Sequence, residues 1–166
     1  MDNNILDKII FRKLNENDKE VFIDFTIIFL IDIFNSFNKS MNEIDKKKIE
    51  NNLNIYFENH INKDDFIGML GEHNGRIVSA AYLIVLDYPI YPGLLNGKAG
   101  KIINVYTYPE YRRKGIAKKL MEKLINEANI KGIKSIDLES SEDGHELYKK
   151  LGFIDDNSFK YMTLEL

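Results

Sequence analysis

Cysteine is absent from this chain of 166 residues. Its absence excludes disulfides, a thiol nucleophile and cysteine-based zinc sites. The three histidines, His60, His73 and His145, show none of the spacing that is typical of metal ligands, so we expect no metal site. The chain also lacks an internal repeat and a linker rich in proline, glycine or serine, which predicts one domain over residues 1–166.

A strong basic balance and a long apolar run are missing as well. The net charge of −3 argues against a general nucleic-acid-binding protein, because such proteins are basic overall. The longest apolar segment, Val21 to Phe34, has 14 residues and contains Asp24 and Asp32, whereas a membrane-spanning helix needs about 20 apolar residues. No basic segment followed by an apolar block marks a signal peptide at the N-terminus. We therefore expect a cytoplasmic protein without a membrane partner.

The apolar pattern and the turn signals that are present predict interspersed helices and strands. Asn74-Gly75 suits a tight hairpin turn, and Gly132 ends a helix with apolar residues at i, i+3 and i+4. The expected strands cover residues 7–14, 65–73, 76–86, 101–108, 133–140, 153–156 and 159–166, and a loop covers 88–100. The expected helices run from a cap at Asn17 or Asp18 to about Phe37, and over 45–59, 113–131 and 142–151. This order predicts an α/β or α+β layered sheet.

One segment, YRRKGIAKKL from Tyr111 to Leu120, places three cations directly before a glycine and an amphipathic run. A strand, a tight basic turn and a helix in this order point the free N–H groups of the first helical turn at a ligand above the strand end. Gly115 has no Cβ and Ala117 is small, so a ligand can approach the backbone closely. Arginines such as Arg112 and Arg113 engage phosphate well. The pattern indicates a pyrophosphate site, although Walker and G-x-G-x-x-G motifs are absent; the alternative is a cationic helix start on the surface.

Two motifs resemble one known family. NVYTYPEYRRKGIAKKL resembles the acetyl-CoA signature of the GNAT acetyltransferases (GCN5-related N-acetyltransferases), whose core, R or Q-x-x-G-x-G or A, is matched by Arg112, Gly115 and Ala117. ELYKKLGF, Glu146 to Phe153, resembles the late helix of that family, which ends in L-Y-x-x-L-G-F. The motifs occur in the order of the family, and the expected elements match its fold over nearly the whole chain.

The resemblance implies a mixed, mostly antiparallel central sheet of about seven strands flanked by about four helices, with two central strands splayed for acetyl-CoA. The strand from Asn104 to Thr107 would carry a bulge and pair its main chain with the pantetheine arm. A backbone N–H near Val105 or Tyr106 would stabilise the negative charge that develops on the thioester oxygen. The implied cofactor-binding residues are Val105, Tyr106, Thr107, Arg112, Arg113, Lys114, Gly115, Ile116, Ala117 and Lys118, with the amides of 113–118 on the pyrophosphate.

The resemblance also assigns Tyr148 to the position that the family uses to protonate the departing sulfur. A tyrosine has a pKa of roughly 10, so it stays protonated at neutral pH and can donate to a thiolate. The alternative for Tyr148 is a ring packed in the core with a solvated hydroxyl. Because the chain has no thiol nucleophile, we expect direct attack by the amine in a ternary complex.

The general base and the acceptor side stay open at this level. Candidates for the base are Glu72, Asp137, Glu139 and Glu142, each of which also fits a solvated surface carboxylate. Asn104 and Tyr106 share one strand face and either look into the acceptor side or pack within the sheet. Asp24 and Asp32 either line the acceptor pocket and attract a cationic amine, or form the wet edge of an otherwise buried helix.

The sequence thus favours an acetyl-CoA-dependent N-acetyltransferase whose acceptor is a primary amine of a small molecule, and its acidic balance suits a cationic acceptor. Acetylation of a protein lysine or N-terminus would instead need an open groove. A catalytically inert CoA-binding module would bind the cofactor without turnover. The first helix is apolar on almost all sides, which predicts burial on several faces or a partner chain, such as a second copy in a homodimer.

Overall fold

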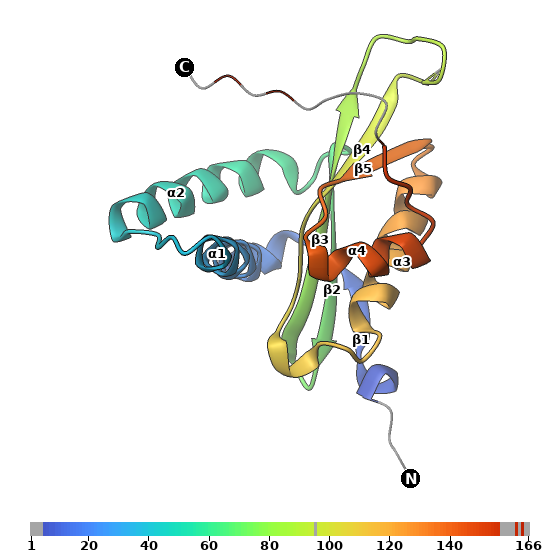
Figure 1. Cartoon of the computed structure of the whole chain (residues 1–166). Coiled ribbons are helices and arrows are strands. Elements are labelled where there is room, and N and C mark those ends of the chain that lie inside the picture. The colour runs from blue at the N-terminus through green and yellow to red at the C-terminus, as the bar shows by residue number, and fades with distance from the viewer. Residues whose placement is uncertain (1–4, 95, 157–161, 163, 165–166) are drawn as a thin grey trace.

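The computed structural model describes residues 5–94, 96–156, 162 and 164. Within them, five strands form one sheet in the order β1-β2-β3-β4-β5. Helices α1 and α2 cover one face of this sheet and α3 and α4 cover the other, so the fold has three layers (Figure 1). The strands are β1 Ile10–Lys13, β2 Phe66–His73, β3 Arg76–Asp87, β4 Lys98–Thr107 and β5 Ser135–Leu138. The helices are α1 Lys19–Ser36, α2 Glu43–His60, α3 Ile116–Ile130 and α4 Glu142–Lys150, with single 3-10 turns at Ile5–Lys8, Glu16–Asp18 and Pro109–Tyr111.

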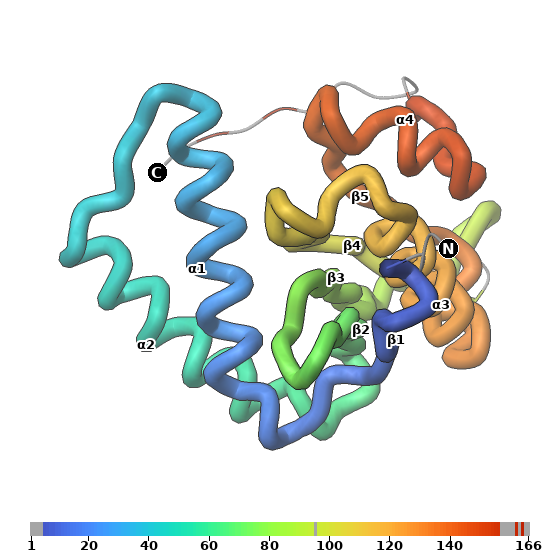
Figure 2. Tube along the Cα trace, turned by 90° about the horizontal axis from the view of Figure 1, so that it is seen from below, coloured from blue at the N-terminus to red at the C-terminus, as the bar shows by residue number. Residues whose placement is uncertain are grey.

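The sheet is mixed and mostly antiparallel, as expected. β1 to β4 pair antiparallel in sequence order, and β4 pairs parallel with β5. The hairpin turn predicted between β2 and β3 is confirmed: Asn74 and Gly75 have φ values of 51° and 78°, which suit a type I′ turn. Viewed along the strands, α1 lies over one face of the sheet and runs from the β1 side toward the β5 side (Figure 2).

Each face of the sheet carries its own apolar core. On one face, α3 buries Leu120, Met121 and Leu124 completely against β2 and β3, and each such side chain contributes about 1.5–3 kcal/mol. On the other face, Phe22 and Phe25 of α1 pack against an aromatic cluster on the sheet. The two cores fix α1 and α3 on opposite sides of β4.

One predicted helix boundary is wrong, for a local reason. The third helix starts at Ile116 and not at Arg113, because Arg113 and Gly115 have left-handed φ values of 59° and 80°. The first helix starts directly after Asp18, one of the two predicted caps. The Asp18 carboxylate makes no cap hydrogen bond to this helix and lies 2.7 Å from Arg12, while Asn15 caps the 3-10 turn before the helix.

The expected count of about seven strands is not reached in the described part of the chain. Residues 153–156, predicted as a strand, form none. The strand predicted over 159–166 falls outside the described residues, apart from Met162 and Leu164, which are exposed and belong to no strand.

The predicted burial of α1 on nearly all sides holds only for its first half. Phe22, Phe25, Thr26 and Ile27 are buried, whereas Phe37, just after the helix, is 69% exposed. Across the described residues, the structure contains no helix whose length and apolar character would let it cross a membrane.

Candidate active site

The start of α3 presents a row of unpaired amides. In the part of the chain that the structure describes, the N–H groups of residues 113–118 donate no hydrogen bond. The first backbone hydrogen bond of this turn runs from Lys119 N to Gly115 O at 3.0 Å. Gly115 is the N-cap residue and, without a side chain, cannot accept a hydrogen bond from these N–H groups. Such amides at a helix start carry a partial positive charge and bind anions.

The small residues of this turn keep the row open. Ile116 is buried in the core, whereas Gly115 is exposed and Ala117 is partly exposed. The φ of 80° at Gly115 is a conformation that side chains with a Cβ adopt only at a cost. The glycine and alanine that the sequence singled out therefore lie where a ligand would approach the backbone.

The cations of the turn point in different directions. Arg113 is exposed beside the amide row, and Lys118 lies 3.7 Å from Glu122. Lys114 Nζ donates to Glu110 O at 2.6 Å. Arg112 instead reaches the α1 side: its Nε donates to Thr107 O at 2.8 Å and its Nη2 lies 3.2 Å from Asp32 Oδ2.

The pairing of β4 with β5 ends near this row of amides. Their last register pair is Ile102 with Leu138, and β4 continues to Thr107 without a β5 partner among the described residues. The two parallel strands end at the same edge of the sheet, next to the start of α3. Beyond Ile102, β4 therefore has an edge without a strand partner among the described residues, at the place where the resemblance implies the splay.

A bulge in β4 lies where the strands separate. Ala80 pairs with Tyr106 and Tyr82 with Ile103, so β4 has one residue more than β3 between these pairs. Asn104, at the bulge, has a left-handed φ of 50°. The expected bulge is therefore present.

The amides after the bulge alternate in direction. Tyr108 N donates to Val78 O on β3 at 3.0 Å, so the Tyr106 amide, two residues earlier, also faces β3, and the Thr107 amide faces the splay. Tyr106 O accepts from the buried Ser79 hydroxyl at 3.0 Å, which fixes this peptide. Two amides, those of Val105 and Tyr106, were predicted for the acyl oxygen. Because the Tyr106 amide faces β3, the Val105 amide is the better placed one.

Tyr148 lies in the last turn of α4. It is 9% exposed, and burial raises the pKa of its hydroxyl, so the hydroxyl stays protonated at neutral pH. A Cβ on Gly144 would lie 2.9 Å from Tyr148 Cε2, which shows that the ring points back toward the start of α4. α4 starts four residues after β5 ends, and the ring belongs to the apolar core on the α3 side of the sheet, where it packs edge-on against Phe153 with 6.0 Å between the centroids.

A cavity of about 550 Å³ also borders Tyr148. Its other walls come from β5, from His145 and Lys149 of α4, and from residues 153–156. The residues of the amide row and of the β4 bulge do not line it. The cavity is therefore a different place from the splay.

The acceptor-side candidates Asn104, Tyr106 and Asp32 come together on the α1 side of β4. Asn104 Nδ2 donates to Thr26 Oγ1 on α1 at 3.5 Å. The Tyr106 ring packs edge-on against Phe25 of α1, with 6.2 Å between the centroids. Burial, followed by a hydrogen bond to Asp32, raises the pKa of Tyr106 to about 12.

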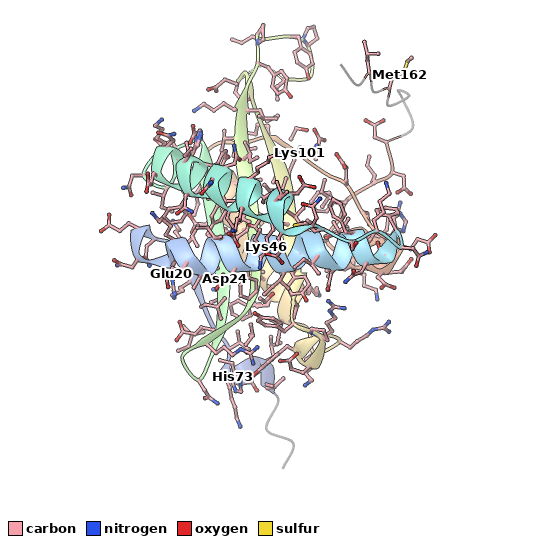
Figure 3. The ribbon with its side chains drawn as sticks, turned by 90° about the vertical axis from the view of Figure 1, so that its left-hand side faces the viewer. Glu20, Asp24, Lys46, His73, Lys101 and Met162 are labelled. Atoms are coloured by element: carbon pink, nitrogen blue, oxygen red, sulfur yellow. The ribbon has the colours of Figure 1, made fainter. Side chains whose placement is uncertain are left out.

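Two of the four candidate bases form ion pairs. Glu72 lies 3.2 Å from Arg12 and Glu139 lies 2.7 Å from Lys101. Asp24, whose role the sequence left open, is exposed on α1 near Glu20 (Figure 3), which favours the wet-edge interpretation for that residue. Asp32 is also exposed, but its pairing with Arg112 ties it to the end of β4.

A hydroxyl pair that was not predicted from the sequence supports the bulge. Ser79 and Thr107 are both buried, with their hydroxyl oxygens 2.7 Å apart. Because Ser79 donates to Tyr106 O, Thr107 donates to Ser79. The only signal in the sequence is a serine within the apolar strand VSAAYL, and a polar residue there needs a partner when it is buried.

Comparison with known proteins gives the class that this fold and site define. The model of the Acetyltransferase (GNAT) family matches residues 30–153, so the chain belongs to this family and is an N-acetyltransferase by class. No curated protein gives a significant match.

Solved structures with a similar fold match nearly the full length of this chain. A predicted acetyltransferase with acetyl-CoA from Clostridium acetobutylicum is 29% identical, with a TM-score of 0.81 over 93% of this chain and 96% of that chain. Glucosamine-6-phosphate N-acetyltransferase from Arabidopsis thaliana is 19% identical (TM-score 0.66; 95% and 99% covered). An aminoglycoside acetyltransferase from an uncultured soil metagenomic sample, in complex with sisomicin, is 18% identical (TM-score 0.66; 97% and 99% covered). The last two likenesses concern the fold alone.

Proposed function

We propose that the protein transfers the acetyl group of acetyl-CoA to a primary amine of a small molecule by direct attack in a ternary complex. The observation that carries this proposal is the row of acceptor-free amides over residues 113–118, beside the splay between β4 and β5. An anion site and a strand with a free edge, side by side, suit a ligand with a pyrophosphate at one end and an amide-bearing arm at the other.

The chain offers partners along the whole of such a ligand. The amides of residues 113–118 would hold the pyrophosphate, with Arg113 adding charge. The main chain of Val105 and Thr107 would pair with the pantetheine arm in the manner of a β-strand. The similar protein from Clostridium acetobutylicum, solved with acetyl-CoA, supports this choice of cosubstrate.

Acetyl-CoA supplies an acyl group that is activated as a thioester. The Val105 N–H would donate to the acyl oxygen, whose negative charge grows as the amine nitrogen bonds to carbon. As the carbon–sulfur bond breaks, the Tyr148 hydroxyl would give its proton to sulfur, and the amine would lose its own proton to solvent. The attacking amine must be neutral, because a protonated amine has no free electron pair.

The acceptor would approach from the α1 side of β4. Asn104, Tyr106 and Asp32 lie there, and Asp32 supplies negative charge. The sugar and aminoglycoside substrates in the names of two similar structures support a small-molecule acceptor.

The test combines binding and turnover. Calorimetric titration with acetyl-CoA and CoA should show one site per chain, and a thiol-release assay over a panel of amines should show turnover with some of them. Cofactor binding without thiol release from any small amine or peptide would contradict catalysis and leave an inert CoA-binding module. Release with lysine peptides alone would replace the small-molecule acceptor by a protein.

A further inference from the structure

The guanidinium of Arg112 lies between a carboxylate and an aromatic ring. Its Cζ is 5.3 Å from the centroid of the Tyr106 ring, and its Nη2 is 3.2 Å from Asp32 Oδ2. An aromatic face with a carboxylate beside it is a general receptor for organic cations. A side chain of the protein itself thus fills a site with the chemistry of a cation receptor.

The aromatic wall of this site is rigid. Tyr106 is only 7% exposed, and Phe25 and Tyr108 hold its ring at centroid distances of 6.2 Å and 5.8 Å. Asp32 lies close enough to the Tyr106 hydroxyl to contribute to the raised pKa of that group. The ring therefore keeps its position beside Asp32 when the cation next to it changes.

The cation, in contrast, is replaceable. The side chains of Arg112 and Asp32 are 47% and 46% exposed, and an ion pair with this exposure contributes less than about fivefold to an equilibrium constant. A ligand cation that gains both the Asp32 carboxylate and the Tyr106 ring has to offset this modest contribution and the hydrogen bond from Arg112 Nε to Thr107 O at 2.8 Å.

The position of the site determines which group of an acceptor occupies it. Tyr106 directly follows the bulge at Asn104 and Val105, so the site lies within about 7 Å along the strand from the acyl position in the proposed function. A cation held by Asp32 stays protonated, whereas the amine that attacks the thioester must be neutral. One nitrogen cannot do both.

We propose that the acceptor carries two basic groups: a cation that replaces the Arg112 guanidinium between Asp32 and Tyr106, and a neutral amine that receives the acetyl group. This inference rests on the proposed function and adds the substrate class, a diamine or polyamine. The bond changes stay as above: a carbon–nitrogen bond forms, the carbon–sulfur bond breaks, the amine proton goes to solvent and sulfur takes the Tyr148 proton. The remote cation keeps its charge throughout.

Cadaverine and pentylamine test this, because they have the same carbon chain and differ by one ammonium group. Each is titrated into the protein with CoA present. We expect cadaverine to bind about twofold to fivefold more tightly, the effect of one half-exposed ion pair. Asp32→Asn should remove this preference, and Asp24→Asn, which changes an exposed carboxylate on the same helix, should keep it.

Equal affinities for the two amines, or a preference that survives in Asp32→Asn, would overturn the inference. A wild-type control does not depend on folding of the variant: high salt should weaken binding of the dication cadaverine more than binding of the monocation pentylamine, and an equal salt effect on the two would also overturn it. Failure of the proposed function is distinguishable. Acetylation of monoamines and diamines alike would retain the function and reject the inference, whereas Asp32-dependent cadaverine binding without any thiol release would retain the cation site and reject acetyl transfer.

Discussion

Gly115 offers a sharp test of the amide row, because the chain contains its own control. Gly115 and Gly132 flank α3 with φ values of 80° and 76°. Alanine at either position takes a left-handed conformation that costs about 1–2 kcal/mol, partly offset by about 0.4–1 kcal/mol from the stiffer unfolded chain. Each variant should therefore lose about 1 kcal/mol of stability, which for a domain of this size lowers Tm by about 2–4 °C.

The two variants should differ in cofactor binding. A Cβ on Gly115 lies within the amide row and 3.3 Å from Leu6 Cδ2, whereas a Cβ on Gly132 meets nothing within 4 Å. Gly115→Ala should lose one or two hydrogen bonds from backbone N–H groups to a phosphate, each worth about 1.5–3 kcal/mol. This loss raises the Kd for acetyl-CoA about tenfold to a hundredfold or more. Gly132→Ala should bind acetyl-CoA like the wild type.

Calorimetry with acetyl-CoA and thermal unfolding measure both effects on the same samples. Acetylpantetheine, which lacks the pyrophosphate, adds a control on the ligand: its kcat/KM as acyl donor should be the same in Gly115→Ala and Gly132→Ala. Equal acetyl-CoA affinities in the two variants, or an equal loss with acetylpantetheine, would refute the assignment of the pyrophosphate to this row.

The remaining predictions concern three other places in the chain. Tyr148→Phe should lower kcat about a hundredfold, as expected for loss of a general acid, with the Kd for CoA unchanged; a normal kcat in the thiol-release assay would remove Tyr148 from the mechanism. Arg112→Gln should bind cadaverine more tightly than the wild type in calorimetry, because the competitor for Asp32 is gone, and weaker binding would argue against competition. Burial alone would raise the pKa of Asp18, but its hydrogen bonds to Arg12 and to the Asn15 amide lower it overall, so its contribution to stability is present at neutral pH and is lost as the pH falls through the lowered value. Arg12→Ala should cost about 2 kcal/mol at pH 7 in urea unfolding, between the values for exposed and buried pairs, and flatten the loss of stability toward acid pH; an unchanged acid profile would contradict this origin.

The order of the elements could be predicted from the sequence because apolar periodicity reports local structure. The hairpin at Asn74-Gly75 and the end of α3 at Gly132 are both where the pattern indicates. Errors occurred where single residues leave the regular conformation. Arg113 is left-handed, and no local pattern predicts this for an arginine.

The candidate site also has one part that could be predicted from the sequence and one part that could not. Its cofactor half is one continuous segment, from the bulge at Asn104 to Lys118, so a short motif contains nearly all of it. The acceptor half joins α1 to β4: Asp32 and Arg112 are 80 residues apart in the chain, and Thr26 and Asn104 are 78 apart. Only tertiary packing brings such pairs together, so sequence could name Asp32 as a candidate and not its partner.

This division has a consequence for specificity. A segment that binds a constant cosubstrate can keep one local pattern, whereas contacts between α1 and β4 can change through single substitutions on α1 without disturbing the amide row or the bulge. A carboxylate at position 32 faces the Tyr106 ring and Arg112; an apolar residue there would leave the cosubstrate site intact and remove the receptor for a cation. Proteins with this fold can therefore share the chemistry at the splay and differ in acceptor, and under the proposed acceptor site residue 32 is the position whose substitution should change most directly which amines are accepted.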